Sequence, residues 1–190
     1  MIVDLGTGDG RAVLAIAARE PGSLVLGIDA NAASMAESSR RAARSPLKGG
    51  LPNAIFVVSS AESLPEEIAG SADEVSVTFP WGSLLRGVLG LDGAVAASLS
   101  RMAKPGAPIT ALVSVTERDG ILEVGRLDEA AVAELGRRLS TYGLDLVEAR
   151  PATIEDLAAA HSSWARRLRS DTSRPVWRLV LRQDGGACPR

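Results

Sequence analysis

Cysteine, histidine and aromatic residues are scarce in this chain of 190 residues. It has one cysteine, one histidine, three tryptophans, two phenylalanines and one tyrosine. A single cysteine excludes a disulfide framework within the chain and a cysteine-rich metal site, so we expect no bound metal. No apolar run reaches the roughly 18–20 residues of a membrane-spanning helix, and no basic segment followed by an apolar one opens the sequence. We therefore expect a cytoplasmic protein without a membrane span or signal peptide.

Basic residues are slightly outnumbered by acidic ones and are unevenly placed. The net charge is −2, yet two stretches, residues 37–48 and 160–182, are strongly basic. Such local clusters can bind phosphate groups even on an acidic protein, although they can equally be ordinary solvated helix faces. The candidate phosphate-binding residues are Arg40, Arg41, Arg44, Lys48, Arg166, Arg167 and Arg174.

Apolar segments of strand length alternate with amphipathic segments of helix length. This alternation predicts an α/β fold with a doubly wound, mostly parallel sheet of seven strands, the last two forming an antiparallel edge. We expect one domain over residues 1–183 and a disordered tail over residues 184–190. The expected strands are residues 1–5, 24–29, 55–58, 73–77, 109–115, 144–148 and 175–181, and the main expected helices are 11–20, 31–44, 92–103, 127–142 and 153–169.

A glycine-rich turn joins the first expected strand to the first helix. Its sequence is Asp4-Leu5-Gly6-Thr7-Gly8-Asp9-Gly10. Glycines let a backbone approach a ligand closely, and a helix N-terminus offers free N–H groups. A dinucleotide fingerprint requires G-x-G-x-x-G, but Arg11 stands where the third glycine would be, so NAD is the weaker alternative. The pattern resembles motif I of the class I S-adenosylmethionine-dependent methyltransferases.

Two further strand ends carry side chains suited to the same cofactor. Asp29 ends the second expected strand, where a carboxylate can accept hydrogen bonds from both ribose hydroxyls. Ala61 and Glu62 follow the third strand, where a backbone N–H and a carboxylate can hold an adenine. The carboxyl ends of parallel strands meet at one edge of a sheet, so we expect these groups to lie together.

The fourth expected strand ends in the corner Phe79-Pro80-Trp81. Proline fixes φ and removes a backbone donor, so the chain leaves the sheet there. Trp81 is then well placed to stack on a flat substrate beyond the strand ends. Amino-group methyltransferases of nucleic acids keep an (Asp/Asn/Ser)-Pro-Pro-aromatic motif at this point. Phe79 in place of the polar first residue favours a ring nitrogen over an amino nitrogen as the methyl acceptor.

These features together resemble one family, the 16S rRNA (adenine(1408)-N1)-methyltransferases that confer aminoglycoside resistance. Six matching motifs span nearly the whole chain in family order. These motifs are Asp4–Arg11, Gly27–Asp29, Lys48–Leu51, Ala61–Pro65, Phe79–Leu85 and Ser162–Leu168. The last two of the six are the most specific.

The resemblance implies S-adenosyl-L-methionine as cofactor and 16S rRNA within the 30S subunit as partner, and docking on the ribosome suits a monomer. It implies that Trp81 and Trp164 sandwich the target adenine, with Ser162 and Pro80 nearby, and that Arg40, Arg41, Arg167 and Arg174 meet rRNA phosphates. The cofactor-binding candidates, from the motif and the resemblance together, are Asp4, Gly6, Gly8, Gly10, Asp29, Ala61, Glu62, Thr78, Phe79 and Ser83.

The chemistry expected of such a site is simple. An adenine paired or stacked in RNA must be flipped out before its N1 can react. Adenine N1 already carries a free lone pair, so no general base is needed, and indole faces favour the cationic base that forms. Catalysis would then come from alignment and electrostatics. We expect His161 to be structural and Trp177 to be a core residue.

Two alternatives remain at this stage. The chain could be a class I methyltransferase acting on a small molecule or protein, or an RNA-binding module that no longer binds the methyl donor. Trp164 could also be a core anchor, on one helix stripe with His161 and Leu168.

In addition, the family carries a segment of a few dozen residues before motif I, and this chain begins almost at that motif. Either the start lies further upstream or the segment is absent. Whether the protein docks on its substrate through this segment is therefore left open.

Overall fold

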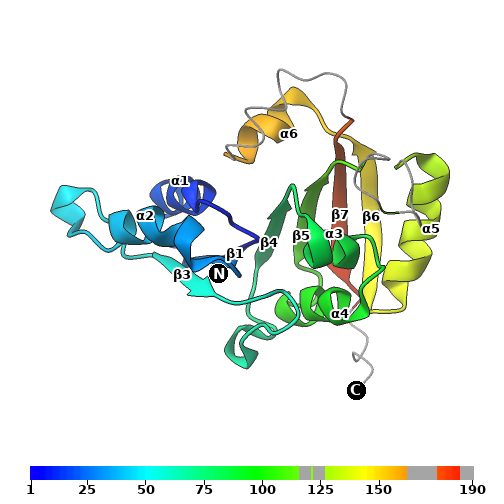
Figure 1. Ribbon diagram of the computed structural model, residues 1–190, viewed down its shortest axis with the longest axis horizontal. Helices are drawn as coiled ribbons and strands as arrows, with labels where there is room; N and C mark the ends of the chain where they lie inside the picture. The colour runs from blue at the N-terminus through cyan, green and yellow to red at the C-terminus, as the bar shows by residue number, and fades with distance from the viewer. Residues whose placement is uncertain (116–120, 122–126, 162–174, 185–190) are drawn as a thin grey trace.

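Seven strands form a single sheet in the computed structural model, which describes residues 1–115, 121, 127–161 and 175–184. The strand order is β3-β2-β1-β4-β5-β7-β6 (Figure 1). In chain order the elements are β1 (Ile2–Leu5), α1 (Arg11–Arg19), β2 (Val25–Asp29), α2 (Ala32–Ala42), η1 (Pro46–Lys48), β3 (Ala54–Val58), η2 (Glu66–Ile68), β4 (Glu74–Thr78), α3 (Gly82–Val88), α4 (Gly93–Met102), β5 (Pro108–Val113), α5 (Glu129–Ser140), β6 (Leu144–Pro151), α6 (Ile154–Ala159) and β7 (Trp177–Gln183).

The sheet is parallel from β3 through β5, and β7 runs antiparallel to both of its neighbours, β5 and β6. The expected seven-stranded, mostly parallel sheet with an antiparallel pair at one edge is therefore confirmed. Because the strand order reverses between β1 and β4, a crevice opens beyond the carboxyl ends of these two strands. The glycine-rich turn and the Phe79-Pro80-Trp81 corner both follow this pair of strands.

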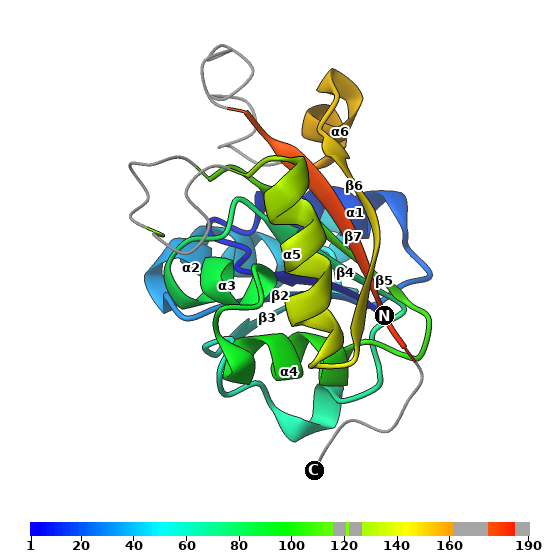
Figure 2. The same ribbon diagram turned by 90° about the vertical axis from the view of Figure 1, so that its right-hand side faces the viewer.

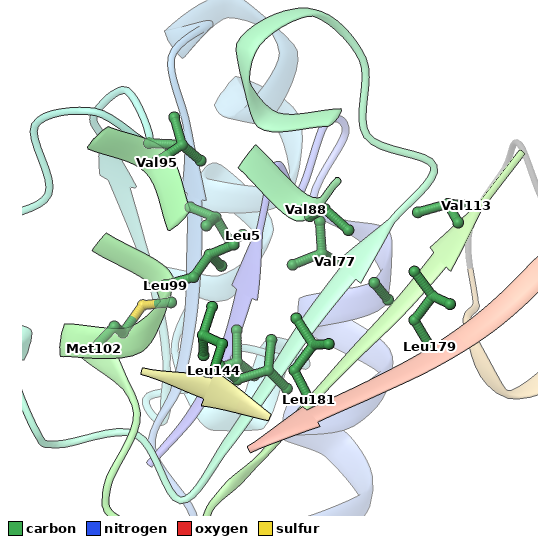
Figure 3. Packing of buried hydrophobic residues seen from close by; sticks show 14 of the residues in the cluster. Leu5, Val77, Val88, Val95, Leu99, Met102, Val113, Leu144, Leu179 and Leu181 are labelled. Atoms are coloured by element: carbon green, nitrogen blue, oxygen red, sulfur yellow. The ribbon is translucent and has the colours of Figure 1, made fainter. Parts of the chain in front are cut away.

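The larger hydrophobic core lies between the sheet and helices α3, α4 and α5. Figure 3 shows Val77 of β4 close to Val88 of α3, and Leu99 and Met102 of α4 near Leu144 of β6. Helix α5 packs along β6 (Figure 2), and Figure 1 shows it at the opposite end of the sheet from α1 and α2. Helix α1 has a smaller core of its own against β2.

Strand β4 shows how the two faces of the sheet differ. Val75 and Val77 are fully buried in the larger core, whereas Ser76 and Thr78 alternate with them and face the opposite side. Successive side chains of a strand point to opposite faces, so this second face presents hydroxyl groups instead of aliphatic ones. Helices α1 and α6 flank that polar face.

The helix starts follow local capping chemistry. Asn31 accepts a hydrogen bond from Ala33 N–H and begins α2, as predicted, and Asp92 does the same for α4 with Val95 N–H. The helix expected over residues 153–169 instead stops at Ala159, because His161 adopts a left-handed conformation with φ 48°. Among the helices described here, none is by itself long and apolar enough to cross a membrane.

Candidate cofactor and substrate site

A cavity of about 250 Å³ opens beyond the carboxyl ends of β1, β2, β3 and β4. Its walls therefore come from the strand ends that the sequence singled out. The lining residues are Asp4–Asp9, Ala12, Ile28–Ala30, Ser59–Glu62 and Thr78–Leu84.

The glycine loop forms one wall, and its glycines have different tasks. Gly8 has φ 58°, and a Cβ added there would meet nothing within 4 Å, so its backbone is open to the cavity. At Gly10 an added Cβ would lie 2.5 Å from Cε1 of Phe56 and 2.9 Å from Cβ of Ser38. Gly10 is outside the cavity lining and begins α1, so its small size serves the packing of α1 against β3.

Asp29 connects the glycine loop to the end of β2. Its Oδ2 accepts a hydrogen bond of 2.8 Å from Gly8 N–H, and its Oδ1 accepts one of 2.8 Å from Asn31 N–H. A carboxylate has about four lone-pair sites, so these two bonds leave capacity for a ligand. Asp29 thus fixes the shape of the loop and still presents acceptor oxygens to the cavity.

Asp4 is a buried carboxylate in the floor of the cavity, with 3% of its surface exposed. Burial raises its pKa, and the nearby carboxylates of Asp29 and Asp9 add to the rise. Ser76 Oγ donates a 2.8 Å hydrogen bond to Oδ1 and opposes the shift. Thr7 also faces the carboxyl and favours its ionised form. However, the Thr7 hydroxyl is not within hydrogen-bonding geometry of any described residue.

No arginine or lysine of the described chain forms an ion pair with Asp4. A buried carboxylate without a cation is costly, so this position favours a ligand that brings positive charge to it. The ammonium and sulfonium groups of S-adenosylmethionine meet that requirement.

Ala61 and Glu62, which follow β3, line the same cavity. Ala61 is 8% exposed, and the neighbouring Glu62 carboxylate is largely exposed to solvent. The hydroxyl of Ser83 lowers the pKa of Glu62 through a hydrogen bond, with smaller contributions from the Glu62 backbone and from Ser60. Glu62 is therefore ionised at neutral pH and links the end of β3 to the first turn of α3.

The Phe79-Pro80-Trp81 corner also lines the cavity. Phe79 has φ 50° and donates its N–H to the carbonyl oxygen of Leu112 at 2.8 Å. A non-glycine residue in this region costs on the order of 1–3 kcal/mol and persists only where its surroundings hold it. The turn leaves Trp81 at the start of α3 with 85% of its surface exposed.

The two predicted basic clusters differ in how much of them the structure describes. Arg40 and Arg41 are exposed on the last turn of α2, Arg44 on the bend that follows, and Lys48 on the η1 segment. Arg40 forms a 2.9 Å ion pair with Glu37, and 74% of its side-chain surface stays exposed to solvent. The predicted substrate and RNA residues Ser162, Trp164, Arg166, Arg167 and Arg174 lie outside the described residues.

Sequence reasoning missed several residues that shape the site. The Phe56 ring packs directly against Gly10, and Ser38 Oγ donates a 2.6 Å hydrogen bond to the carbonyl oxygen of Asp9. Ser76 holds the Asp4 carboxylate. The alternation of Ser76 with Val75 and Val77 was a usable signal for Ser76, whereas the contacts of Phe56 and Ser38 depend on tertiary packing alone.

Comparisons with known proteins agree with this site. A family model described as NpmA, 16S rRNA (adenine(1408)-N(1))-methyltransferase, matches residues 1–182. The chain is 36% identical over 179 residues to the 16S rRNA (adenine(1408)-N(1))-methyltransferase of Streptoalloteichus tenebrarius, covering 92% of this chain and 82% of that one.

Similar solved structures are methyltransferases of the same kind. A variant of the 16S rRNA (adenine(1408)-N(1))-methyltransferase from Catenulisporales acidiphilia, solved with its cosubstrate SAM, superimposes with a TM-score of 0.85 at 36% identity. That match covers 100% of this chain and 88% of the other. The aminoglycoside resistance methyltransferase NpmB1 gives a TM-score of 0.76 at 38% identity, covering 94% and 85% of the two chains.

The matched span, the identity and the cavity at the expected strand ends lead to one assignment. The chain belongs to the 16S rRNA (adenine(1408)-N(1))-methyltransferase family, whose members are S-adenosylmethionine-dependent enzymes.

Proposed function

We propose that this protein methylates N1 of the decoding-site adenine of 16S rRNA within the 30S subunit, and that the product protects the ribosome from aminoglycosides. The observation that carries the proposal is the exposed Trp81, placed by a strained corner at the edge of a carboxylate-lined cavity. An indole exposed at the edge of a cavity offers a flat face on which a nucleic-acid base can stack.

The methyl donor would be held by the groups already described. Asp4 would face its positive charge, Asp29 its ribose hydroxyls, and Ala61 and Glu62 its adenine. Further contacts would come from the backbone of the glycine loop and from the corner, by Gly6, Gly8, Thr78, Phe79 and Ser83. S-adenosylmethionine supplies a methyl group on a positively charged sulfur, which is transferred to a nucleophile in one displacement. Gly10 would act indirectly, by allowing α1 to start against Phe56.

The substrate must present an adenine that has been flipped out of its RNA helix. Trp81 would stack on one face of the flipped adenine, and Trp164 would cover the other, with Ser162 and Pro80 beside them. Stacking on an aromatic ring contributes about 1–3 kcal/mol per base, which offsets the stacking lost on flipping. The N1 lone pair would attack without a general base, and the two indole faces would stabilise the cationic product. No acid–base residue is required.

The basic clusters would position the rRNA on the enzyme. Arg40, Arg41, Arg44 and Lys48 present four positive charges along one exposed stretch. The second cluster, with Arg166, Arg167 and Arg174, would meet phosphates beside the target base. Contacts to phosphates make binding salt-dependent and carry little sequence information, so recognition would rest on the folded decoding site of the 30S subunit. Binding by a monomer in the cytoplasm suits this substrate.

The experiment that tests the proposal compares four acceptors: intact 30S subunits, 50S subunits, naked 16S rRNA and bulk protein. Each would be incubated with the enzyme and S-adenosylmethionine carrying a labelled methyl group. We expect label in 30S subunits only or predominantly. Label in bulk protein, with no effect of reversing the charges of Arg40, Arg41 and Arg167, would favour the alternative of a non-ribosomal class I methyltransferase. Absence of donor binding in calorimetry would favour an RNA-binding module.

A further inference from the structure

Thr7 stands between Gly6 and Gly8 in the glycine loop, and both polar groups of its backbone are fixed. Its N–H donates to the carbonyl oxygen of Ile28 at 3.0 Å, and its carbonyl oxygen accepts from Gly10 N–H at 3.1 Å. A β-branched side chain has few χ1 choices, so a fixed backbone also limits where its hydroxyl can lie. The position of the Thr7 hydroxyl is therefore set by the loop, between the end of β2 and the start of α1.

The Thr7 hydroxyl is buried and has no hydrogen-bond partner among the described residues. Only 9% of the Thr7 surface is exposed, and the residue lines the cofactor cavity. A buried hydroxyl without a partner costs free energy, and native proteins leave few such groups. The structure therefore holds a donor at the cofactor cavity that is still to be satisfied.

An acceptor with spare capacity lies beside this donor. The Thr7 hydroxyl faces the carboxyl group of Asp4 and lowers its pKa. Ser76, the partner of Asp4 in the register of β1 and β4, already donates to Oδ1 of Asp4 at 2.8 Å. A carboxylate offers about four lone-pair sites, so Asp4 can accept a second hydrogen bond.

The strength of that second bond depends on the charge of Asp4. Burial and the neighbouring carboxylates of Asp29 and Asp9 raise the pKa of Asp4 and so favour its neutral form. A positively charged group in the cavity would favour the carboxylate instead. Hydrogen bonds to an ionised acceptor are shorter and roughly twice as strong as those between neutral groups. The Thr7 hydroxyl therefore gains most from Asp4 when the cavity holds a cation.

We propose that Thr7 is a positioning residue for the methyl donor, whose hydroxyl closes on Asp4 when the positive charge of the donor occupies the cavity. Thr7 and Ser76 then hold the carboxylate from two sides in the orientation that faces this charge. The inference rests on the proposed function, in which Asp4 faces the positive charge of S-adenosylmethionine. Thr7 would thereby contribute to the selection of a charged ligand without being needed for the fold of the ligand-free protein.

The test uses Thr7→Val, which keeps the shape of the side chain and removes the hydroxyl, and Thr7→Ser, which keeps the hydroxyl. Thr110→Val is the matched control, because Thr110 is a half-buried threonine of β5 on the same polar face, outside the cofactor cavity. Calorimetry measures the affinity of each protein for S-adenosylmethionine and for 5′-methylthioadenosine. The second ligand keeps the adenosine and the sulfur but lacks both the ammonium and the sulfonium charge. Melting curves of the ligand-free proteins complete the set.

We expect Thr7→Val to bind S-adenosylmethionine about ten- to a hundredfold more weakly, the range for one lost hydrogen bond to a charged group. Its affinity for 5′-methylthioadenosine should be unchanged, because that ligand brings no positive charge to Asp4. Thr7→Ser should keep most of the affinity for S-adenosylmethionine, and Thr110→Val should keep all of it. The Tm of ligand-free Thr7→Val should be equal to that of the wild type or higher, since the substitution removes an unpaired buried hydroxyl.

Equal losses of affinity for both ligands in Thr7→Val would overturn the inference, because they would show that the hydroxyl only shapes the loop. Unchanged affinity for S-adenosylmethionine would overturn it as well, and so would a lower Tm of the ligand-free variant. These are binding and stability measurements, so they are independent of methyl transfer. A wild-type protein that binds S-adenosylmethionine but does not methylate 30S subunits would refute the proposed function and leave this inference to be decided by the two ligands.

Discussion

Replacing Trp81 by alanine removes the indole that stands 85% exposed at the edge of the cavity. A tryptophan buries up to about 250 Å² when fully enclosed, so the 15% covered here amounts to about 40 Å². At about 25 cal/mol per Å², the truncation should lower the free energy of unfolding by about 1 kcal/mol. For a chain of this size that is a fall of roughly 2–4 °C in Tm.

The effect on methyl transfer should be far larger than the effect on stability. Loss of one stacking face costs about 1–3 kcal/mol per base, which corresponds to about 5- to 140-fold in the rate of methylation. The assay is single-turnover methyl transfer to 30S subunits, with S-adenosylmethionine affinity measured in parallel by calorimetry. We expect the rate to fall within that range and the donor affinity to be largely kept.

Two controls separate the possible roles of Trp81. Trp81→Phe keeps a ring for stacking and should retain more activity than Trp81→Ala. Trp177→Phe changes a half-buried tryptophan of β7 and should lower stability without a specific loss of methyl transfer. Equal losses of donor affinity and methyl transfer in Trp81→Ala would refute a substrate-stacking role and make Trp81 part of the cofactor wall. Full activity of Trp81→Ala would refute both the substrate-stacking role and the cofactor-wall role.

Three other perturbations test separate parts of the account. Asp4→Asn should raise Tm near neutral pH, because burial raises the pKa of this carboxyl and its ionised form costs stability above that pKa, while calorimetry should show weaker donor binding. Burial and Arg19 lower the pKa of His161, so stability should fall as the pH drops below about 6.5, and melting curves of His161→Asn should show a smaller fall. Reversing the charges of Arg40 and Arg41 should weaken 30S binding and flatten its dependence on salt in filter-binding assays, with donor affinity unchanged.

The strands, the capped helices and the three strand ends of the cofactor cavity were predictable because each depends on local sequence. The role of Gly10 was less accessible, since its spacing indicates a cofactor contact and only the tertiary structure shows Phe56 beneath it. The end of α6 at Ala159 was not predictable either. The apolar periodicity continues past this point, and the contact at His161 comes from Arg19, 142 residues earlier.

The most direct test of the central claim is reverse transcription of 16S rRNA taken from 30S subunits that were incubated with the protein and S-adenosylmethionine. A methyl group on N1 blocks the Watson–Crick edge of adenine and stops the transcriptase. The account predicts a new, donor-dependent stop at the decoding-site adenine, much weaker with Trp81→Ala. No such stop, from protein that is folded and binds the donor, would contradict it.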